Sequence, residues 1–300
     1  PGTIPICFRV KHNHLTKCES RSGEHKGAQG LIGNLSELCS VFNFWQTKLR
    51  ESPMPDALGW RCKFAVVAPS TNTVVQPEFD GMRPLGVTNH FGRIAISNMP
   101  LTSNEDFIKL MSAIESELYE AIDRCMTCEP DYLLMGMSAV MFWGGYDAAA
   151  KRREEIEQYT GLGVSSGSFA VEAALKLVNA KRIAVLSPYQ PVSDEQVTRF
   201  FTECGFEVVR FKGLRCPTPI AISHVQGGEI RGHLASIDGE DVDALVQVGT
   251  NLSMACEAVE AERQFSKSVI AINTATYWHG LRAQGLDDKV DGFGPLLLKY

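Results

Sequence analysis

The chain has 300 residues, of which 44% are hydrophobic and 21% charged, and its formal net charge is −6. This is the composition of a globular protein that is long enough to bury a substantial core. The only local basic cluster, Lys151–Arg153, is followed at once by Glu154 and Glu155, so we expect no nucleic-acid partner. No apolar stretch approaches the ~20 residues that a membrane-spanning helix needs, so we expect no membrane partner either.

The nine cysteines are scattered along the chain and lack the density of a small disulfide-rich scaffold. We therefore interpret them as reduced thiols in a cytoplasmic protein. Cys125 and Cys128 form a lone CxxC pair, with no second pair and no histidines at ligand spacing nearby. Because zinc sites need three or four such ligands, the sequence predicts no metal site.

Residues 1–58 differ from the rest of the chain. Their apolar residues show poor periodicity, and the segment ends in the proline-rich run Glu51–Pro55. We expect a poorly ordered N-terminal extension with a short helix near Leu35–Leu49, and Met54 is a plausible natural start.

From Trp60 onward, strand-like apolar runs alternate with segments of helical periodicity. The predicted strands are Lys63–Ala68, Arg93–Ser97, Tyr132–Met137, a short one at Val164, Arg182–Ser187, Glu207–Phe211, Ala244–Val248 and Ser268–Ile272. The predicted helices are Glu105–Arg124, Asp147–Gln158, Ser168–Asn179, Ser193–Cys204, Gly228–Ile237, Ala255–Gln264 and Thr274–Ala283. This alternation predicts parallel sheets with helices on both faces.

The first half of this pattern is repeated in the second half. Phe64–Thr73 is an apolar run that breaks at a proline, and Ile183–Pro191 does the same; Asp131–Ser138 and Asp243–Asn251 form a second such pair. The repeat predicts an α/β fold of two similar flavodoxin-like lobes, related by a pseudo-twofold duplication, with the active-site cleft between them. We assign residues 59–165 to the first lobe and 166–273 to the second, with residues 274–300 packing back on the first.

Four strand ends are expected to meet in this cleft, because open parallel sheets bind ligands beyond the carboxyl ends of their strands. They are Pro69–Thr73, Gly136–Ser138, Pro188–Tyr189 and Gly249–Asn251. None contains a GxGxxG or Walker motif, so no nucleotide cofactor is indicated. Small uncharged hydrogen-bonding groups near helix N-termini suit an anion, which predicts a small carboxylate as the ligand.

At these residues the chain resembles the aspartate/glutamate racemase superfamily, and within it the branch of maleate cis–trans isomerase and arylmalonate decarboxylase. The similarity runs from about Phe64 to Tyr300. It implies a cofactor-free enzyme in which Ser70 and Asn72 bind a substrate carboxylate and Tyr189 faces the substrate. Related folds are often small oligomers, so the resemblance leaves a homo-oligomer open.

The chain departs from the family pattern at the two catalytic positions. Racemases and maleate isomerases of this type use two cysteines on opposite faces of the substrate, and arylmalonate decarboxylase keeps only the second. The corresponding loops here are Gly136-Met137-Ser138 and Gly249-Thr250-Asn251-Leu252, with glycine at both cysteine positions. Glycine cannot supply a thiolate. Gly136, Met137, Gly249, Thr250 and Asn251 then remain as substrate-binding residues.

Other side chains are candidates for the chemistry. Ser138 is a candidate nucleophile, although such a role needs a base and an oxyanion hole, and it is also placed to bind a carboxylate or cap a helix. Tyr189 is a candidate general acid, with substrate binding as the alternative. Cys216, in a loop that could approach the cleft, is a candidate displaced thiol. His279 is a candidate base, with a place on the outer helix face as the alternative.

Three hypotheses for function follow. The first is a cofactor-free isomerase or decarboxylase of a small carboxylate or dicarboxylate, acting through an enolate held by amides and hydroxyls. The second is a hydrolase of small esters or amides that uses Ser138 or an activated water. The third is a non-catalytic protein that binds small carboxylates.

Overall fold

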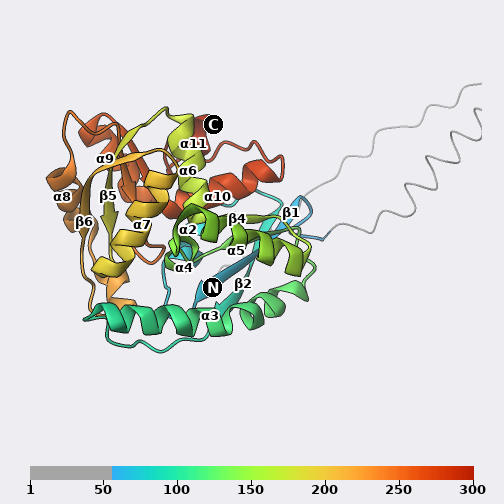
Figure 1. The fold of residues 1–300 in the computed structure, drawn as a ribbon. Coiled ribbons are helices and arrows are strands. Elements are labelled where there is room, and N and C mark those ends of the chain that lie inside the picture. Colours follow the sequence, from blue (N-terminus) through green and yellow to red (C-terminus); the bar gives the residue numbers. More distant parts are fainter. Residues whose placement is uncertain (1–55) are drawn as a thin grey trace, which may run out of the picture. The chain divides into compact units, whose positions relative to one another are not determined.

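A computed structural model describes residues 56–300 of the chain (Figure 1). The predictions made for the N-terminal extension, its helix near Leu35–Leu49 and a start at Met54 lie outside the described residues. Within the described part of the chain, no helix is long and apolar enough to cross a membrane.

Two parallel four-stranded sheets form the framework. The first has the strand order β2-β1-β3-β4, and the second has the order β6-β5-β7-β8. The strands are β1 (Cys62–Pro69), β2 (Val87–Ile94), β3 (Tyr132–Met135), β4 (Val164–Ser166), β5 (Arg182–Ser187), β6 (Glu207–Gly213), β7 (Ala244–Gln247) and β8 (Ser268–Ala271). The two orders are the same when the strands of each sheet are numbered along the chain. The predicted α/β fold with two similar lobes is therefore confirmed, and we name the lobes after these two sheets.

Helices connect the strands. They are α2 (Val75–Met82), α3 (Asn104–Met126), α4 (Ala139–Phe142), α5 (Gly145–Thr160), α6 (Gly167–Leu177), α7 (Pro191–Glu203), the 3-10 helix η1 (Ile220–His224), α8 (Gly227–Ile237), α9 (Ala255–Phe265), α10 (Ile272–Ala283) and α11 (Pro295–Lys299). The sequence analysis missed α2, α4, η1 and α11, which are too short to show a periodic pattern. It also placed the second strand at Arg93–Ser97, which is wrong, because β2 is a half-buried edge strand whose polar residues conceal it.

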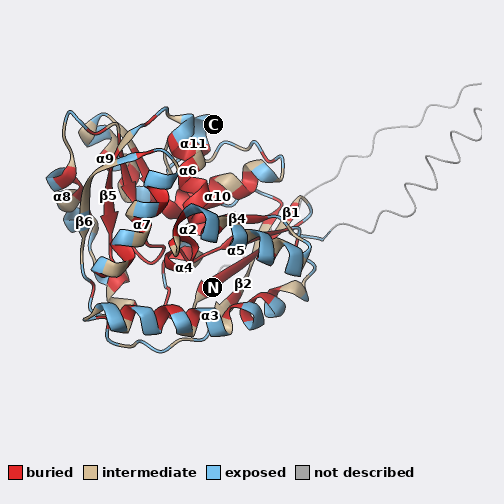
Figure 2. Ribbon diagram, in the orientation of Figure 1, coloured by how far each residue is buried: buried red, intermediate tan, exposed pale blue. Residues whose placement is uncertain are grey.

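Amphipathic patterning explains how the main elements form. β1 lies inside its sheet and is buried along nearly its whole length, which accounts for its continuous apolar run. In α3, Ser103 caps the N-terminus by accepting a hydrogen bond from the Asp106 amide, and residues such as Phe107 and Ile114 form its buried face. Figure 2 shows the alternation of buried and exposed residues along this helix.

The helix that follows the last strand of the second sheet packs on the first lobe. α10 contacts α2, α6, β3 and β4. Its Tyr277 is fully buried, with its ring centroid 5.6 Å from that of Phe64 on β1 and 5.0 Å from that of Phe79 on α2. The C-terminal part of the chain thus completes the core of the N-terminal lobe.

A carboxylate of the first lobe caps a helix of the second. Glu78 on α2 accepts hydrogen bonds through Oε1 from the amides of Met254 and Ala255, both at 3.1 Å, at the start of α9. Its Oε2 accepts a 2.6 Å bond from Asn273. Burial raises the pKa of Glu78, and its hydrogen bonds offset part of that rise. The N-cap residue of α9 makes no side-chain capping hydrogen bond, so the amides at this helix end rely on Glu78 as their acceptor. Glu78 thereby links the two lobes.

Candidate active site

The carboxyl ends of the central strands of both sheets meet around one cavity of about 50 Å³. Four loops contribute to its lining: Thr71 and Asn72 follow β1, Met137 and Ser138 follow β3, Tyr189 follows β5, and Thr250 and Asn251 follow β7. The rest of the lining is mostly apolar: Pro69, Ile96, Leu110, Ile114, Ala139, Val140, Pro219 and Ile222. The structure therefore brings together the four strand ends that were singled out in the sequence.

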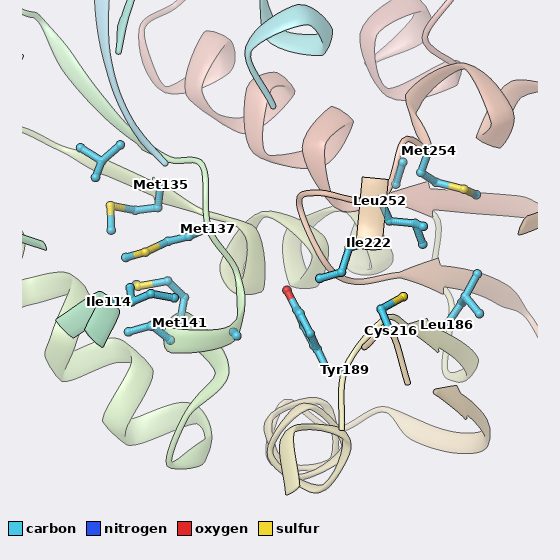
Figure 3. Close-up of a cluster of buried hydrophobic side chains, with 14 of the residues drawn as sticks. Ile114, Met135, Met137, Met141, Leu186, Tyr189, Cys216, Ile222, Leu252 and Met254 are labelled. Carbon is cyan, nitrogen blue, oxygen red and sulfur yellow. The ribbon is translucent and has the colours of Figure 1, made fainter. Parts of the chain in front are cut away.

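Two hydroxyl groups from opposite lobes face each other in this cavity. Ser138 Oγ lies 2.7 Å from Tyr189 Oη, and the two residues are only 1% and 8% exposed. The Tyr189 ring packs on Phe107 of α3 with a centroid separation of 5.3 Å. Figure 3 shows Tyr189 between Met137 and Met141 on one side and Ile222 on the other.

Burial raises the pKa of Tyr189 to about 12, and the hydrogen bond with Ser138 offsets only part of this rise. Desolvation disfavours the phenolate, so the phenol stays protonated at neutral pH. Tyr189 is thus suited to donate a hydrogen bond or a proton, and it is poorly suited to act as a base.

Three of the predicted substrate-binding residues bond across the lobe boundary. Asn72 Nδ2 donates to Thr250 Oγ1 at 3.1 Å, and Thr250 Oγ1 donates in turn to the carbonyl of Gly136 at 3.1 Å. Asn251 Oδ1 accepts a 2.9 Å bond from the amide of Thr73. These side chains hold the lobes together around the cavity, and a bound carboxylate has to exchange some of these bonds for its own.

Ser70 does not join this group. It is exposed and lies outside the cavity lining. Its hydroxyl donates to the carbonyl of Ile96 and accepts from the amide of Ile96, both at 3.1 Å. In the structure, Ser70 thus ties the β1 loop to the β2 loop, and its contact with a substrate stays a prediction.

Gly136 and Gly249 occupy equivalent places after β3 and β7. A Cβ atom on Gly136 would lie 3.0 Å from the Cβ of Ala68, which is tight but leaves room for small shifts. Gly249 has a φ of +104°, and a Cβ there would lie 2.5 Å from Cγ of Pro188. Neighbouring atoms thus leave little space for a side chain at either glycine, and only glycine suits position 249 without strain.

The two displaced candidates, Cys216 and His279, lie outside the cavity lining. Cys216 is buried near Tyr189 (Figure 3), and burial raises the pKa of its thiol to about 11, so it is protonated at neutral pH. His279 Nδ1 lies 2.9 Å from Ser165 Oγ on β4, and burial lowers the pKa of this histidine. Among the described residues that line the cavity there is neither a cysteine nor a histidine.

Two arginines that the sequence analysis missed hold the cavity loops in place by bonding to their backbone carbonyls. Arg93, on β2, donates to the carbonyl of Asn72 at 2.9 Å. Arg215, just after β6, donates to the carbonyl of Tyr189 and pairs with Asp194. The sequence could have indicated both arginines, because they lie at or near the ends of equivalent edge strands.

Comparisons with known proteins agree with this architecture. A sequence model of the arylmalonate decarboxylase family matches residues 111–297, which is more than half of the chain. A maleate isomerase of Pseudomonas putida is 28% identical over 246 residues, covering 77% of this chain and 95% of the relative.

Solved structures show the same fold. A Nocardia farcinica maleate cis-trans isomerase with a covalently bound succinylcysteine intermediate superposes with a TM-score of 0.72 at 22% identity, covering 80% of this chain and 99% of that one. Arylmalonate decarboxylase superposes with a TM-score of 0.63 at 16% identity, covering 78% and 98%. With its duplicated sheets, its cavity at four strand ends and its match to the family's sequence pattern, the chain belongs to the arylmalonate decarboxylase family.

Proposed function

We propose that this protein is a decarboxylase of a small carboxylate that works without a cofactor and without the cysteine pair of its relatives. Its membership of a family that includes isomerases and decarboxylases supports an activity of the isomerase or lyase class. The choice of decarboxylation rests on one observation, the hydrogen bond between Ser138 and Tyr189 inside the cavity.

Decarboxylation requires a proton donor, which this cavity can supply. The substrate is a malonate-type acid, with two carboxylates on one carbon. The C–C bond to one carboxylate breaks, CO2 leaves, and the electron pair stays behind as an enediolate on the remaining carboxylate. Tyr189 donates its phenolic proton to the carbon and recovers a proton from solvent through the Ser138 hydroxyl. This sequence needs a proton donor and no resident base.

Hydrogen-bond donors near the cavity would stabilise the enediolate. The amide of Asn72 and the hydroxyls of Ser138 and Thr250 are buried, uncharged and fixed by their neighbours. These donors would stabilise a developing negative charge after exchanging some of their bonds between the lobes for bonds to the ligand. Met137, Gly136, Gly249 and Asn251 complete the proposed binding loops.

The apolar wall of the cavity indicates the kind of substituent that the substrate carries. Ile96, Leu110, Ile114, Val140 and Ile222 line one region together and offer no hydrogen bonds from their side chains. The cavity of about 50 Å³ is smaller than such a substrate, so an aromatic or branched aliphatic group on the malonate carbon would have to push these side chains apart to bury its surface among them. A dicarboxylate without such a substituent would make no contact with these apolar side chains.

Isomerisation of a dicarboxylate is the second candidate, and the similarity to maleate isomerases favours it. Such an isomerisation requires a nucleophile that adds to a double bond and later leaves. The Tyr189 phenol and the Ser138 hydroxyl are weaker nucleophiles than a thiolate. We therefore place decarboxylation first.

The experiment is to incubate the purified protein with phenylmalonate and, separately, with maleate in D2O, and to follow both by NMR. We expect phenylacetate that carries one deuterium at the new C–H position. Tyr189→Phe should reduce the rate roughly 100-fold or more, since general acids contribute about that much. Tyr119→Phe, which changes a half-exposed tyrosine on α3, is the matched control and should leave the rate unchanged.

Each other outcome would replace this proposal with another. Conversion of maleate to fumarate without any decarboxylation would establish the isomerase. Ester cleavage that Ser138→Ala abolishes would establish the hydrolase. Binding of carboxylates without turnover would establish the non-catalytic protein.

A further inference from the structure

A second cavity, of about 130 Å³, lies between α9, β8, the start of α10 and the C-terminal helix α11. It shares no lining residue with the candidate active site. Five polar residues line it: Glu262 of α9, Ser268 of β8, Thr274 of α10, Lys299 of α11 and Tyr300. A cavity of this size holds several waters or one small solute.

Thr274 lacks a partner that its burial calls for. It is 4% exposed, and its Oγ1 makes no hydrogen bond to any group within residues 56–300. Leaving a buried hydroxyl unsatisfied costs free energy, so native proteins rarely do it. Thr274 lines the cavity, so a ligand there would supply the missing bond once this hydroxyl turns toward it.

Glu262 presents an unused carboxylate oxygen. Its Oε1 accepts a 3.1 Å bond from the amide of Val269 on β8, whereas its Oε2 accepts none from the described residues. Burial raises the pKa of Glu262, and the nearby charge of Lys299 offsets part of that rise. A cationic group in the cavity would favour the ionised carboxylate further.

Lys299 supplies the opposite charge without contacting Glu262. The two side chains line the same cavity, yet none of the ion pairs among residues 56–300 joins them. The end of α11 is held in place, because the carbonyl of Tyr300 accepts bonds from Trp278 Nε1 at 3.2 Å and Arg282 Nε at 2.7 Å. The cavity therefore carries one fixed negative group and one positive group, with space for a ligand to bridge them.

We propose that this cavity is a binding site for a small zwitterion, of the size of an amino acid. Its ammonium group pairs with Glu262, and its carboxylate accepts hydrogen bonds from Lys299 and Thr274. A lone cation or anion would satisfy only one of the two charges. The site is independent of the reaction proposed for the first cavity.

The test is isothermal titration of the full chain with glycine, β-alanine and 4-aminobutanoate, which differ in the spacing of their two charges. Ethylammonium and acetate, each carrying one charge, are the comparison compounds. We expect one of the zwitterions to bind with one-to-one stoichiometry and to raise the melting temperature. Each single-charge compound should bind at least 10-fold more weakly.

Matched variants locate the site. Glu262→Gln, Lys299→Met and Thr274→Val should each weaken binding of that zwitterion, the first two by at least 10-fold. Glu260→Gln and Lys289→Met change exposed residues outside the cavity and should leave binding intact. Ser138→Ala should also leave it intact, which separates this site from the candidate active site. The proposal is overturned if none of the zwitterions binds, or if binding survives both Glu262→Gln and Lys299→Met.

Discussion

The guanidinium of Arg215 donates a hydrogen bond to the carbonyl of Tyr189, the residue whose phenol faces the cavity. The same nitrogen also pairs with the carboxylate of Asp194, which is 8% exposed and leaves its Oδ1 without a partner among the described residues. The position of the tyrosine loop thus depends on an ion pair between a buried carboxylate, Asp194, and an exposed arginine side chain.

Asp194 should make stability depend on pH. Burial raises its pKa from 3.8 to about 6, against the opposing effect of Arg215. Between these two values the folded state binds more protons than the unfolded state, so this group lowers stability as pH rises through the window. The cost should reach on the order of 3 kcal/mol above pH 6, at about 1.4 kcal/mol per pKa unit.

Asp194→Asn removes this titration. The free energy of unfolding of Asp194→Asn minus that of the wild type, from urea titrations at pH 4, 5, 6 and 7, should grow up to pH 6 and then level off. Glu195→Gln, at the exposed neighbouring position, is the control and should show no such trend. If the difference shrinks as pH rises, the ion pair with Arg215 outweighs burial and the predicted sign is wrong.

The bond between Ser138 and Tyr189 should be measurable by a double-mutant cycle. Each hydroxyl is buried, so Ser138→Ala and Tyr189→Phe each leave the other hydroxyl without its partner. We expect a coupling energy of about 1 kcal/mol in the free energy of unfolding. The pair Ser138→Ala and Tyr119→Phe should be additive, and additivity in the Ser138–Tyr189 cycle would mean that the bond contributes nothing.

Removal of Glu78 should weaken the junction of the lobes. Glu78→Ala leaves the amides of Met254 and Ala255 and the side chain of Asn273 without their acceptor, so we expect a loss of about 1–3 kcal/mol. Glu78→Gln keeps one acceptor and should cost less. Denaturant unfolding measures both, with Glu154→Ala at an exposed position as the control. Equal stability of Glu78→Ala and the wild type would show that the cap contributes nothing to the free energy of unfolding.

The two glycines should differ in their tolerance of a side chain. Gly249→Ala forces a Cβ atom against Pro188 at a positive φ, a strain of about 1–3 kcal/mol or more, whereas Gly136→Ala meets contacts of 3.0 Å that small shifts can relieve. The melting temperature should therefore fall more for Gly249→Ala. Gly232→Ala, where a Cβ meets nothing within 4 Å, should not be destabilising. A smaller loss at position 249 than at 136 would contradict this reading of the backbone.

The sequence sufficed for the framework of the site. Continuous apolar runs such as Lys63–Ala68 marked the buried strands, and the repeat placed their ends in one cleft. The sequence could not show that Ser70 and Asn72 differ in position. They lie two residues apart on a tight loop, which can turn one side chain outward and the other into the cavity.

Contacts between the lobes could not be predicted from the sequence, for a different reason. The distance between Ser138 and Tyr189, and the reach of Glu78 to α9, depend on how two separately patterned lobes are docked. Periodicity within one element carries no information about that docking. Arg93 and Arg215 were missed although they lie at or near the ends of equivalent edge strands, because the loop atoms that they bind are backbone carbonyls, which any residue type provides.

The packing of α10 on the first lobe has a consequence for how the protein is made. Ile272–Ala283 is synthesised after every strand of both sheets, yet its Tyr277 fills the space between Phe64 and Phe79 near the start of the fold. While the second lobe is being translated, the apolar face that Tyr277 covers has no partner, and such open surface favours aggregation. We therefore expect the first lobe to complete its core only when the C-terminal helix has left the ribosome.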